Sequence, residues 1–141
     1  MTALMLAIPV LLAGVVLTTA LPGRTVKFAA AVGSQALAAG LVLWTVVPVL
    51  AGRPAVLDHT YAWSYPFEAI RIHVDALAAF FLAWSLPLTL LGTIYAHGYL
   101  ARSFDEGRNP GPHFALLNLV ALSFVIVYTV QNALVFLLGW E

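Results

Sequence analysis

Long uncharged apolar runs are the feature that most constrains the fold of this chain. Met1 to Leu21 contains no charged residue, and neither does the stretch of about 27 residues from Phe114 to Trp140. A transmembrane helix needs about 20 apolar residues, because the hydrocarbon core of a bilayer is about 30 Å thick. Charged residues make up 9% of the 141 residues, against about a quarter in soluble domains. The sequence therefore predicts one all-α membrane domain, 1–141, embedded in a lipid bilayer.

The chain is neutral overall and has no cysteine, and both facts exclude classes of function. A nucleic-acid partner would require a basic surface, but six basic residues are balanced by six acidic ones. Without cysteine there is no thiolate for an iron–sulfur cluster or a Cys-type zinc site. The four histidines also lack the close spacing of metal ligands. We therefore expect no nucleic-acid partner, no metal, no cofactor and no catalytic residue.

Four segments are long and apolar enough to be transmembrane helices. They lie at about residues 2–21, 28–50, 76–96 and 113–130. Small residues in "AAAVGSQALAAG", within the second segment, favour close packing between helices. A signal peptide is an alternative interpretation of the first segment, although the basic residues that open such a peptide are missing. Lys27, the only lysine, is expected in the loop between the first two helices.

The apolar run after His113 is too long for one span. As a single helix it would measure about 40 Å. Gln131 and Asn132 interrupt it, so we predict a turn there and the start of a fifth helix at 133–141. This helix is incomplete as a membrane span. Without a partner, we expect residues 131–141 to fold back to the membrane surface, because unpaired carbonyl groups are costly within lipid.

The segment at 51–75 is too polar to cross a bilayer. Its "AIRIHV" alternates apolar and polar residues and is rich in β-branched side chains, which predicts a short strand. "LDHTYAW" is the candidate partner strand, so we expect a short β-hairpin between the second and third helices. Tyr61, Trp63 and Tyr65 suit the headgroup layer of the membrane.

Basic residues predict the orientation of the chain. The first and third loops carry more of them than the second: Arg24, Lys27, Arg102 and Arg108, against Arg53 and Arg71. Short loops rich in Lys and Arg remain in the cytoplasm. We therefore expect a multi-pass protein of the cell inner (plasma) membrane, with its N-terminus and the hairpin on the extracytoplasmic side.

Asp75 directly precedes the third predicted helix. As an N-cap, its carboxylate would accept hydrogen bonds from free amides and complement the helix dipole. The same loop carries Arg71 and Glu68, so the sequence also allows an ion pair between Arg71 and Asp75.

Glu141 follows the oily sequence "NALVFLLGW" and has two interpretations. On a fifth helix that starts at the turn, it would be about 13 Å from the turn, near the bilayer midplane. Ionisable groups at that depth usually mark ion or proton pathways. On one long, tilted fourth helix, Trp140 and Glu141 would instead lie at the interface. Spacing alone leaves both open.

Three stretches resemble the antiporter-like membrane subunits shared by respiratory NADH–quinone oxidoreductase and membrane-bound hydrogenases, most closely the hydrogenase-4 component B and formate hydrogenlyase branch. They are "RIHVDALAAFFLAW", "YAHGYL" and "FALLNLVALSFVIVYTVQNALVFLLGWE", which is similar to the fourth helix, the Asn-containing turn and the Trp-Glu of the fifth helix. The resemblance covers most of the chain after about Arg53. Phe124 departs from it, standing where the family usually has Met, and members have about fourteen helices.

The resemblance implies that Glu141 is the fifth-helix glutamate, which in the family pairs with a lysine on a later helix during proton translocation. It also implies that the partners are other membrane subunits of an oxidoreductase complex, together with the later helices, and that the chain is the N-terminal part of such a subunit. A small structural or assembly membrane protein with four helices and no transport role is the alternative.

Overall fold

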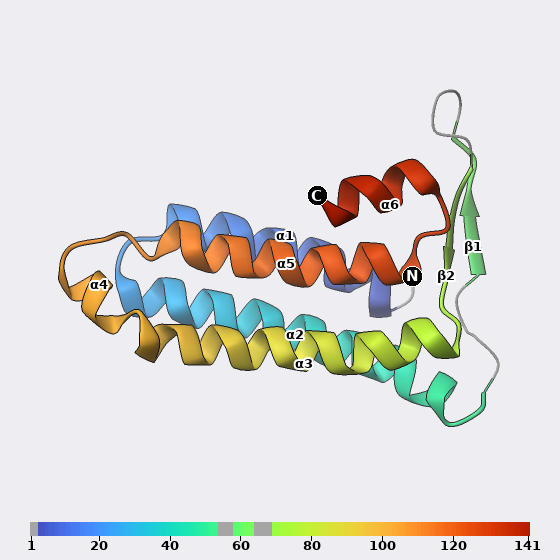
Figure 1. The fold of residues 1–141 in the computed structure, drawn as a ribbon, viewed down its shortest axis with the longest axis horizontal. Helices are drawn as coiled ribbons and strands as arrows, with labels where there is room; N and C mark the ends of the chain where they lie inside the picture. The colour runs from blue at the N-terminus through green and yellow to red at the C-terminus, as the bar shows by residue number, and fades with distance from the viewer. Residues whose placement is uncertain (1–2, 54–57, 64–68) are drawn as a thin grey trace.

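The computed structural model is a bundle of four long helices and describes residues 3–53, 58–63 and 69–141 (Figure 1). The long helices are α1 (Ala3–Ala20), α2 (Arg24–Leu50), α3 (Ala76–Tyr99) and α5 (Gly111–Thr129). All four are long and apolar enough to cross a membrane. The mostly helical fold with four helices of spanning length is therefore confirmed, and it indicates a membrane protein.

The boundary between the first two helices differs from the prediction. α2 begins at Arg24 rather than at 28, so Lys27 lies in the first turn of α2 and not in a loop. Gly23 makes the sharp reversal possible because its φ of +83° is open to glycine but strained for other residues. The amide of Lys27 then donates to the carbonyl of Gly23 at 3.2 Å. The predicted start of the first helix at Thr2 lies outside the described residues.

The other helix ends lie within a few residues of the predicted positions. α3 continues to Tyr99, and a short helix, α4 (Ala101–Asp105), interrupts what the sequence presented as a plain loop. α5 starts at Gly111, with Pro112 in its first turn, where a missing amide is harmless. α6 (Ala133–Trp140) follows the turn at Gln131 and Asn132.

Apolar side chains fill the bundle along most of its length. α1 packs against α2 and α5, and α3 packs against the same two helices. The core is formed mainly by aliphatic side chains, among them Leu4, Leu11, Val42, Val46, Leu82, Leu86 and Val125. In a bilayer, lipid tails are as apolar as this core, so close packing and interhelical hydrogen bonds must hold the helices together.

Two buried polar pairs supply such hydrogen bonds. The hydroxyl of Ser34 on α2 donates to Oδ1 of Asn118 on α5 at 2.8 Å. The hydroxyl of Thr93 on α3 donates to Oε1 of Gln35 on α2 at 2.9 Å. Gly14 allows α1 to approach the first pair, because a Cβ there would lie 2.3 Å from the Ser34 hydroxyl. Together these contacts connect all four long helices.

A β-hairpin stands at the end of the bundle where α2 ends and α3 begins (Figure 1). Its strands, β1 (Asp58–Tyr61) and β2 (Ile70–His73), are antiparallel. The chain between α5 and α6 joins the free edge of β2: Val130 bridges to Ile72, and the amide of Gln131 donates to the carbonyl of Arg71 at 2.8 Å. The hairpin therefore holds the turn between α5 and α6.

The contact at Gly14 generates the first prediction. Gly14→Ala should destabilise the bundle by about 1–3 kcal/mol, because the added methyl group overpacks a site with no free space. Adding Ser34→Gly should recover part of this loss, since it removes both the hydroxyl and the Cβ that the methyl group would strike. Thermal unfolding in detergent measures both effects.

Gly33→Ala is the matched control, because a Cβ at Gly33 meets nothing within 4 Å. Equal melting temperatures for the Gly14 and Gly33 variants would contradict the proposed close approach of α1 to α2 and α5.

Candidate functional site

The orientation of α6 determines where Glu141 lies. Asn132 is the N-cap of α6, and its side-chain oxygen accepts hydrogen bonds from the amides of Leu134 and Val135, each at 3.1 Å. From this cap α6 runs back alongside α5, away from the hairpin end, and the C-terminus lies part-way along the length of the bundle (Figure 1). α6 thus packs along α5, and the expectation that residues 131–141 return to the membrane surface stays a prediction.

Two contacts explain why α6 remains against α5. The hydroxyl of Ser123 on α5 donates to the carbonyl of Gly139, one of the last carbonyls of α6 that lack a partner within the helix. Gly139 also lets the helices approach closely, because a Cβ there would lie 2.6 Å from Cγ2 of Ile126. A side-chain hydroxyl on α5 thus satisfies a carbonyl that would otherwise be unpaired.

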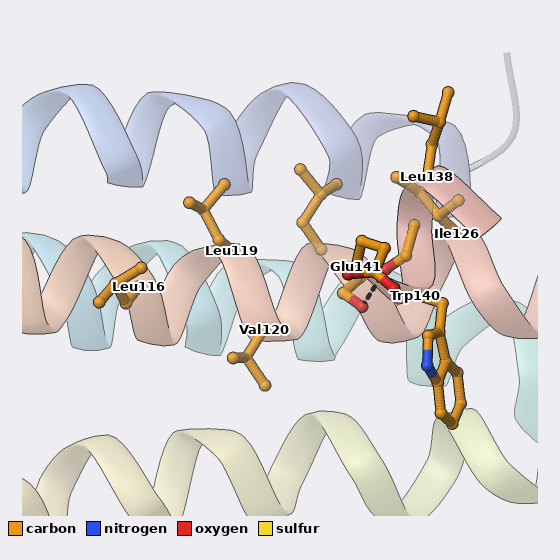
Figure 2. Close-up of a pocket in the computed structure, with 10 residues that line it drawn as sticks. Leu116, Leu119, Val120, Ile126, Leu138, Trp140 and Glu141 are labelled. Atoms are coloured by element: carbon orange, nitrogen blue, oxygen red, sulfur yellow. Dashed lines mark hydrogen bonds between the residues drawn. The ribbon is translucent and has the colours of Figure 1, made fainter. Parts of the chain in front are cut away.

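Glu141 lines a cavity of about 380 Å³ between α5 and α6 (Figure 2). Most of the lining is aliphatic: Leu116, Leu119, Val120, Leu122, Ile126 and Leu138. Ser123, Gly139 and Trp140 complete the lining with Glu141. Among the described residues that line this mostly apolar cavity, Glu141 is the only ionisable one.

The same cavity fixes the depth of Glu141 along α5. α5 has 19 residues and measures about 28 Å, which matches the hydrocarbon thickness of about 30 Å. Leu119 and Val120, at the middle of α5, line the cavity together with Glu141. Glu141 therefore lies beside the middle of a membrane-length helix, and the reading in which it ends one long fourth helix is wrong, because the helix breaks after Thr129.

No basic side chain among the described residues forms an ion pair with Glu141. Lys27 is at the far end of α5, where its ammonium group donates to Oδ1 of Asn109 at 2.9 Å. It is buried between α1 and α5: a Cβ on Gly111 would lie 2.8 Å from Lys27 Nζ and 2.7 Å from the Thr18 carbonyl. That carbonyl lacks its helical donor because residue 22 is proline.

Lys27 is a buried charge that the sequence placed in a loop. Its ammonium group stabilises the C-terminal end of α1, where the helix dipole is negative. Gly23 is the sequence feature that could have indicated this position. Its positive φ completes the chain reversal at residue 23, so α2 begins at Arg24 and Lys27 falls in its first turn.

The structure separates the roles of Asp75 and Arg71. Asp75 occupies the N-cap position of α3, and its Oδ1 accepts a hydrogen bond from the amide of Ala78 at 2.7 Å. Arg71 pairs with Asp58 and not with Asp75; its Nε lies 2.7 Å from Asp58 Oδ1. Asp58 and Arg71 are diagonal neighbours on one face of the hairpin, since Asp58 opposes His73. Glu68 and Tyr65 lie outside the described residues.

The ion pair on the hairpin shifts the pKa values of Asp58 and Arg71. The hydrogen bond from Arg71 is the main reason that the pKa of Asp58 lies below its usual value. The same hydrogen bond raises the pKa of Arg71. His73 adds a weaker positive influence, with Nδ1 at 3.9 Å from Asp58 Oδ2.

Neither a metal centre nor a known relative identifies the chain. Within residues 3–53, 58–63 and 69–141, no group of three or more His, Asp or Glu residues is placed to hold a metal ion. No protein-family model matches the sequence, and no curated protein matches it. The resemblance to antiporter-like subunits therefore remains a prediction.

The hairpin ion pair generates a pH-dependent prediction. Because the pKa of Asp58 is lowered, the pair stabilises the hairpin above the ordinary pKa of aspartate and is lost as the pH falls through the lowered value. Asp58→Asn should abolish this pH dependence and make the Gln131 amide exchange severalfold faster, since its acceptor is the Arg71 carbonyl. Hydrogen exchange of the Gln131 amide, followed as a function of pH, measures both effects. Asp105→Asn, which breaks an ion pair with Arg24 at the opposite end, is the control and should leave Gln131 unchanged.

The Gly139 contact generates a third prediction. Gly139→Ala should push α6 away from α5, and adding Ile126→Ala should bring it back by removing the side-chain carbon that the new methyl group strikes. The chain has no native cysteine, so spin labels at introduced cysteines on Leu116 and Leu138 report the separation. An unchanged distance in Gly139→Ala would contradict the packing of α6, and Gly92→Ala, at an open position on α3, is the control.

Proposed function

We propose that this chain forms the first helices of a proton-translocating, antiporter-like subunit of a membrane-bound hydrogenase or NADH–quinone oxidoreductase complex. In this proposal Glu141 is a proton-binding group. Partner subunits carry out electron transfer, and this chain holds no redox centre. The observation that carries the proposal is the position of Glu141 beside the middle of α5, in an apolar cavity.

In this proposal the carboxylate of Glu141 lies in the hydrocarbon region of the membrane. An ionised carboxylate at mid-bilayer depth is costly, so such a group favours either a proton or a nearby cation. A carboxylate that exchanges its proton for a nearby cation couples its protonation to the position of that cation. Moving a unit charge across 100 mV changes its energy by about 2.3 kcal/mol, which is the scale on which such a step operates.

The surrounding backbone supports this role. A helix that ends inside the membrane, as α6 does in this proposal, is tolerated where its free polar groups have partners in the protein. Here Asn132, Ser123 and the carbonyl of Arg71 provide those partners. The break allows a short helix to carry Glu141 back to mid-depth.

The cation would come from outside the described part of the chain. Lys27 is engaged with Asn109 at the other end of α5, so it does not neutralise Glu141. Under the proposal, a lysine on a further transmembrane helix faces the α5–α6 cavity and completes the pair. The same proposal places the hairpin and the N-terminus on the extracytoplasmic side.

Glu141→Gln tests the proposal in the assembled complex. We expect loss of proton translocation with normal assembly, because glutamine has a similar size but binds no exchangeable proton. Proton uptake by membrane vesicles during turnover measures the effect. Glu106→Gln is the control, since Glu106 lies on the polar loop and pairs only with Arg102, at 3.5 Å. Unchanged translocation in Glu141→Gln would contradict the assigned role.

Co-purification tests the assignment to a complex. Isolated in a mild detergent, the tagged chain should bring down hydrogenase or dehydrogenase subunits. If it is recovered without them, the alternative of a small structural or assembly protein is favoured. The two interhelical pairs, Ser34–Asn118 and Gln35–Thr93, are the observation that fits that alternative, because they hold a four-helix bundle together without Glu141.

A further inference from the structure

The outer face of α2 carries a groove far from Glu141. Two adjoining cavities, of about 630 Å³ and about 400 Å³, share Gly40 and Trp44. Ala36, Leu37 and Ala3 lie at one end of this α2 groove, and Pro48 and Arg53 lie at the other. Its lining combines small residues, Ala36 and Gly40, with large apolar side chains.

The length of α2 places this groove at a membrane boundary. α2 has 27 residues and measures about 40 Å, longer than the hydrocarbon core by about 10 Å. Arg24, at its first residue, pairs with Asp105 and marks the polar boundary at that end. A rise of about 30 Å from Arg24 ends at Trp44.

The length of α1 independently gives the same membrane depth for Trp44. The helix has 18 residues, or about 27 Å, and its first residue, Ala3, lines the groove together with Trp44. Trp44 is 80% exposed, and exposed tryptophan is typical of the membrane interface. The half of the α2 groove before Trp44 therefore faces hydrocarbon, and the half after it faces headgroups.

Arg53 supplies a positive charge to the headgroup half. Gly52, with φ +82°, ends α2, and the amide of Arg53 donates to the carbonyl of Pro48 at 3.1 Å. This C-cap holds Arg53 over the last turn, where its side chain lines the cavity. Among the described residues, Arg53 forms no ion pair. An apolar slot in the hydrocarbon thus continues into a cationic end at headgroup depth.

We propose that the α2 groove binds an anionic phospholipid, with an acyl chain along Gly40 and the phosphate on Arg53. A phospholipid has this sequence of parts: an apolar chain, an interfacial glycerol and a phosphate. An anionic headgroup such as that of phosphatidylglycerol brings no ammonium group to compete with Arg53. The inference is independent of the proton pathway proposed for Glu141.

A partner transmembrane helix is the competing occupant, because small residues at positions 36 and 40 also suit helix packing. It is disfavoured by the cation at one end. A helix would have to supply a carboxylate at the level of Arg53, whereas every phospholipid places a phosphate there.

The full chain in vesicles of phosphatidylcholine and phosphatidylglycerol provides the test. Native mass spectrometry after release from the membrane measures the phosphatidylglycerol retained. Arg53→Gln should weaken retention of phosphatidylglycerol about fivefold, as expected from about 1 kcal/mol per basic residue, and leave phosphatidylcholine unchanged. Gly40→Leu should reduce retention of both lipids, because it fills the slot.

Two matched controls accompany these variants. Gly33→Leu places the same side chain at another open position of α2, outside the groove, and should change nothing. Arg102→Gln removes an exposed arginine at the opposite end. Gly40→Leu should fold normally, because a Cβ at Gly40 meets nothing within 4 Å.

Two results would overturn the proposal. One is equal retention of phosphatidylglycerol by wild type, Arg53→Gln and Gly40→Leu. The other is a dimer of the chain that disappears in Gly40→Leu while lipid retention is unaffected, which would identify the groove as a contact between helices.

Discussion

Every backbone polar group within a bilayer needs a partner in the protein, and α6, which runs from the turn at Gln131 and Asn132 back to the middle of α5, has polar groups at both ends that must meet this requirement. Three parts of the chain meet it. The β2 strand accepts the amide of Gln131, Asn132 caps the first turn of α6, and Ser123 donates to the carbonyl of Gly139. Without these partners α6 would not be held along α5, and Glu141 would have no defined position.

Hydropathy was enough to predict the four spans, because a bilayer imposes both length and composition on them. The turn at Gln131 and Asn132 was also visible, since two amide side chains interrupt an apolar run. The predicted "AIRIHV" and "LDHTYAW" strands correspond to β2 and β1. The sequence did not reveal that the segment after α5 pairs with the free edge of β2. Bridging of Val130 to Ile72 joins residues far apart in the chain, and no local pattern encodes it.

Two side chains were assigned to the wrong surroundings for the same reason. Lys27 was expected in a loop because it is charged and closely follows the helix breakers Pro22 and Gly23. Its ammonium group instead lies between α1 and α5 and donates a hydrogen bond to Asn109. Arg71 was considered as a partner of Asp75 because they are close in sequence. The hairpin register instead brings it to Asp58. Closeness in sequence predicts the cap at Asp75, because the cap and its donor are three residues apart. It does not predict contacts that depend on strand register or on helix packing.

Two charged groups remain on apolar grooves without an ion pair in the described part of the chain, and they have opposite sign. Glu141 lies between α5 and α6 and Arg53 lies beside the last turn of α2, and our proposals put the first at mid-depth and the second at headgroup depth. Lipid headgroups reach the second position but not the first. Under our two proposals, a lipid phosphate neutralises Arg53, whereas Glu141 exchanges a proton for a cation on another protein segment. This difference in depth is why we assign lipid binding to one groove and proton handling to the other.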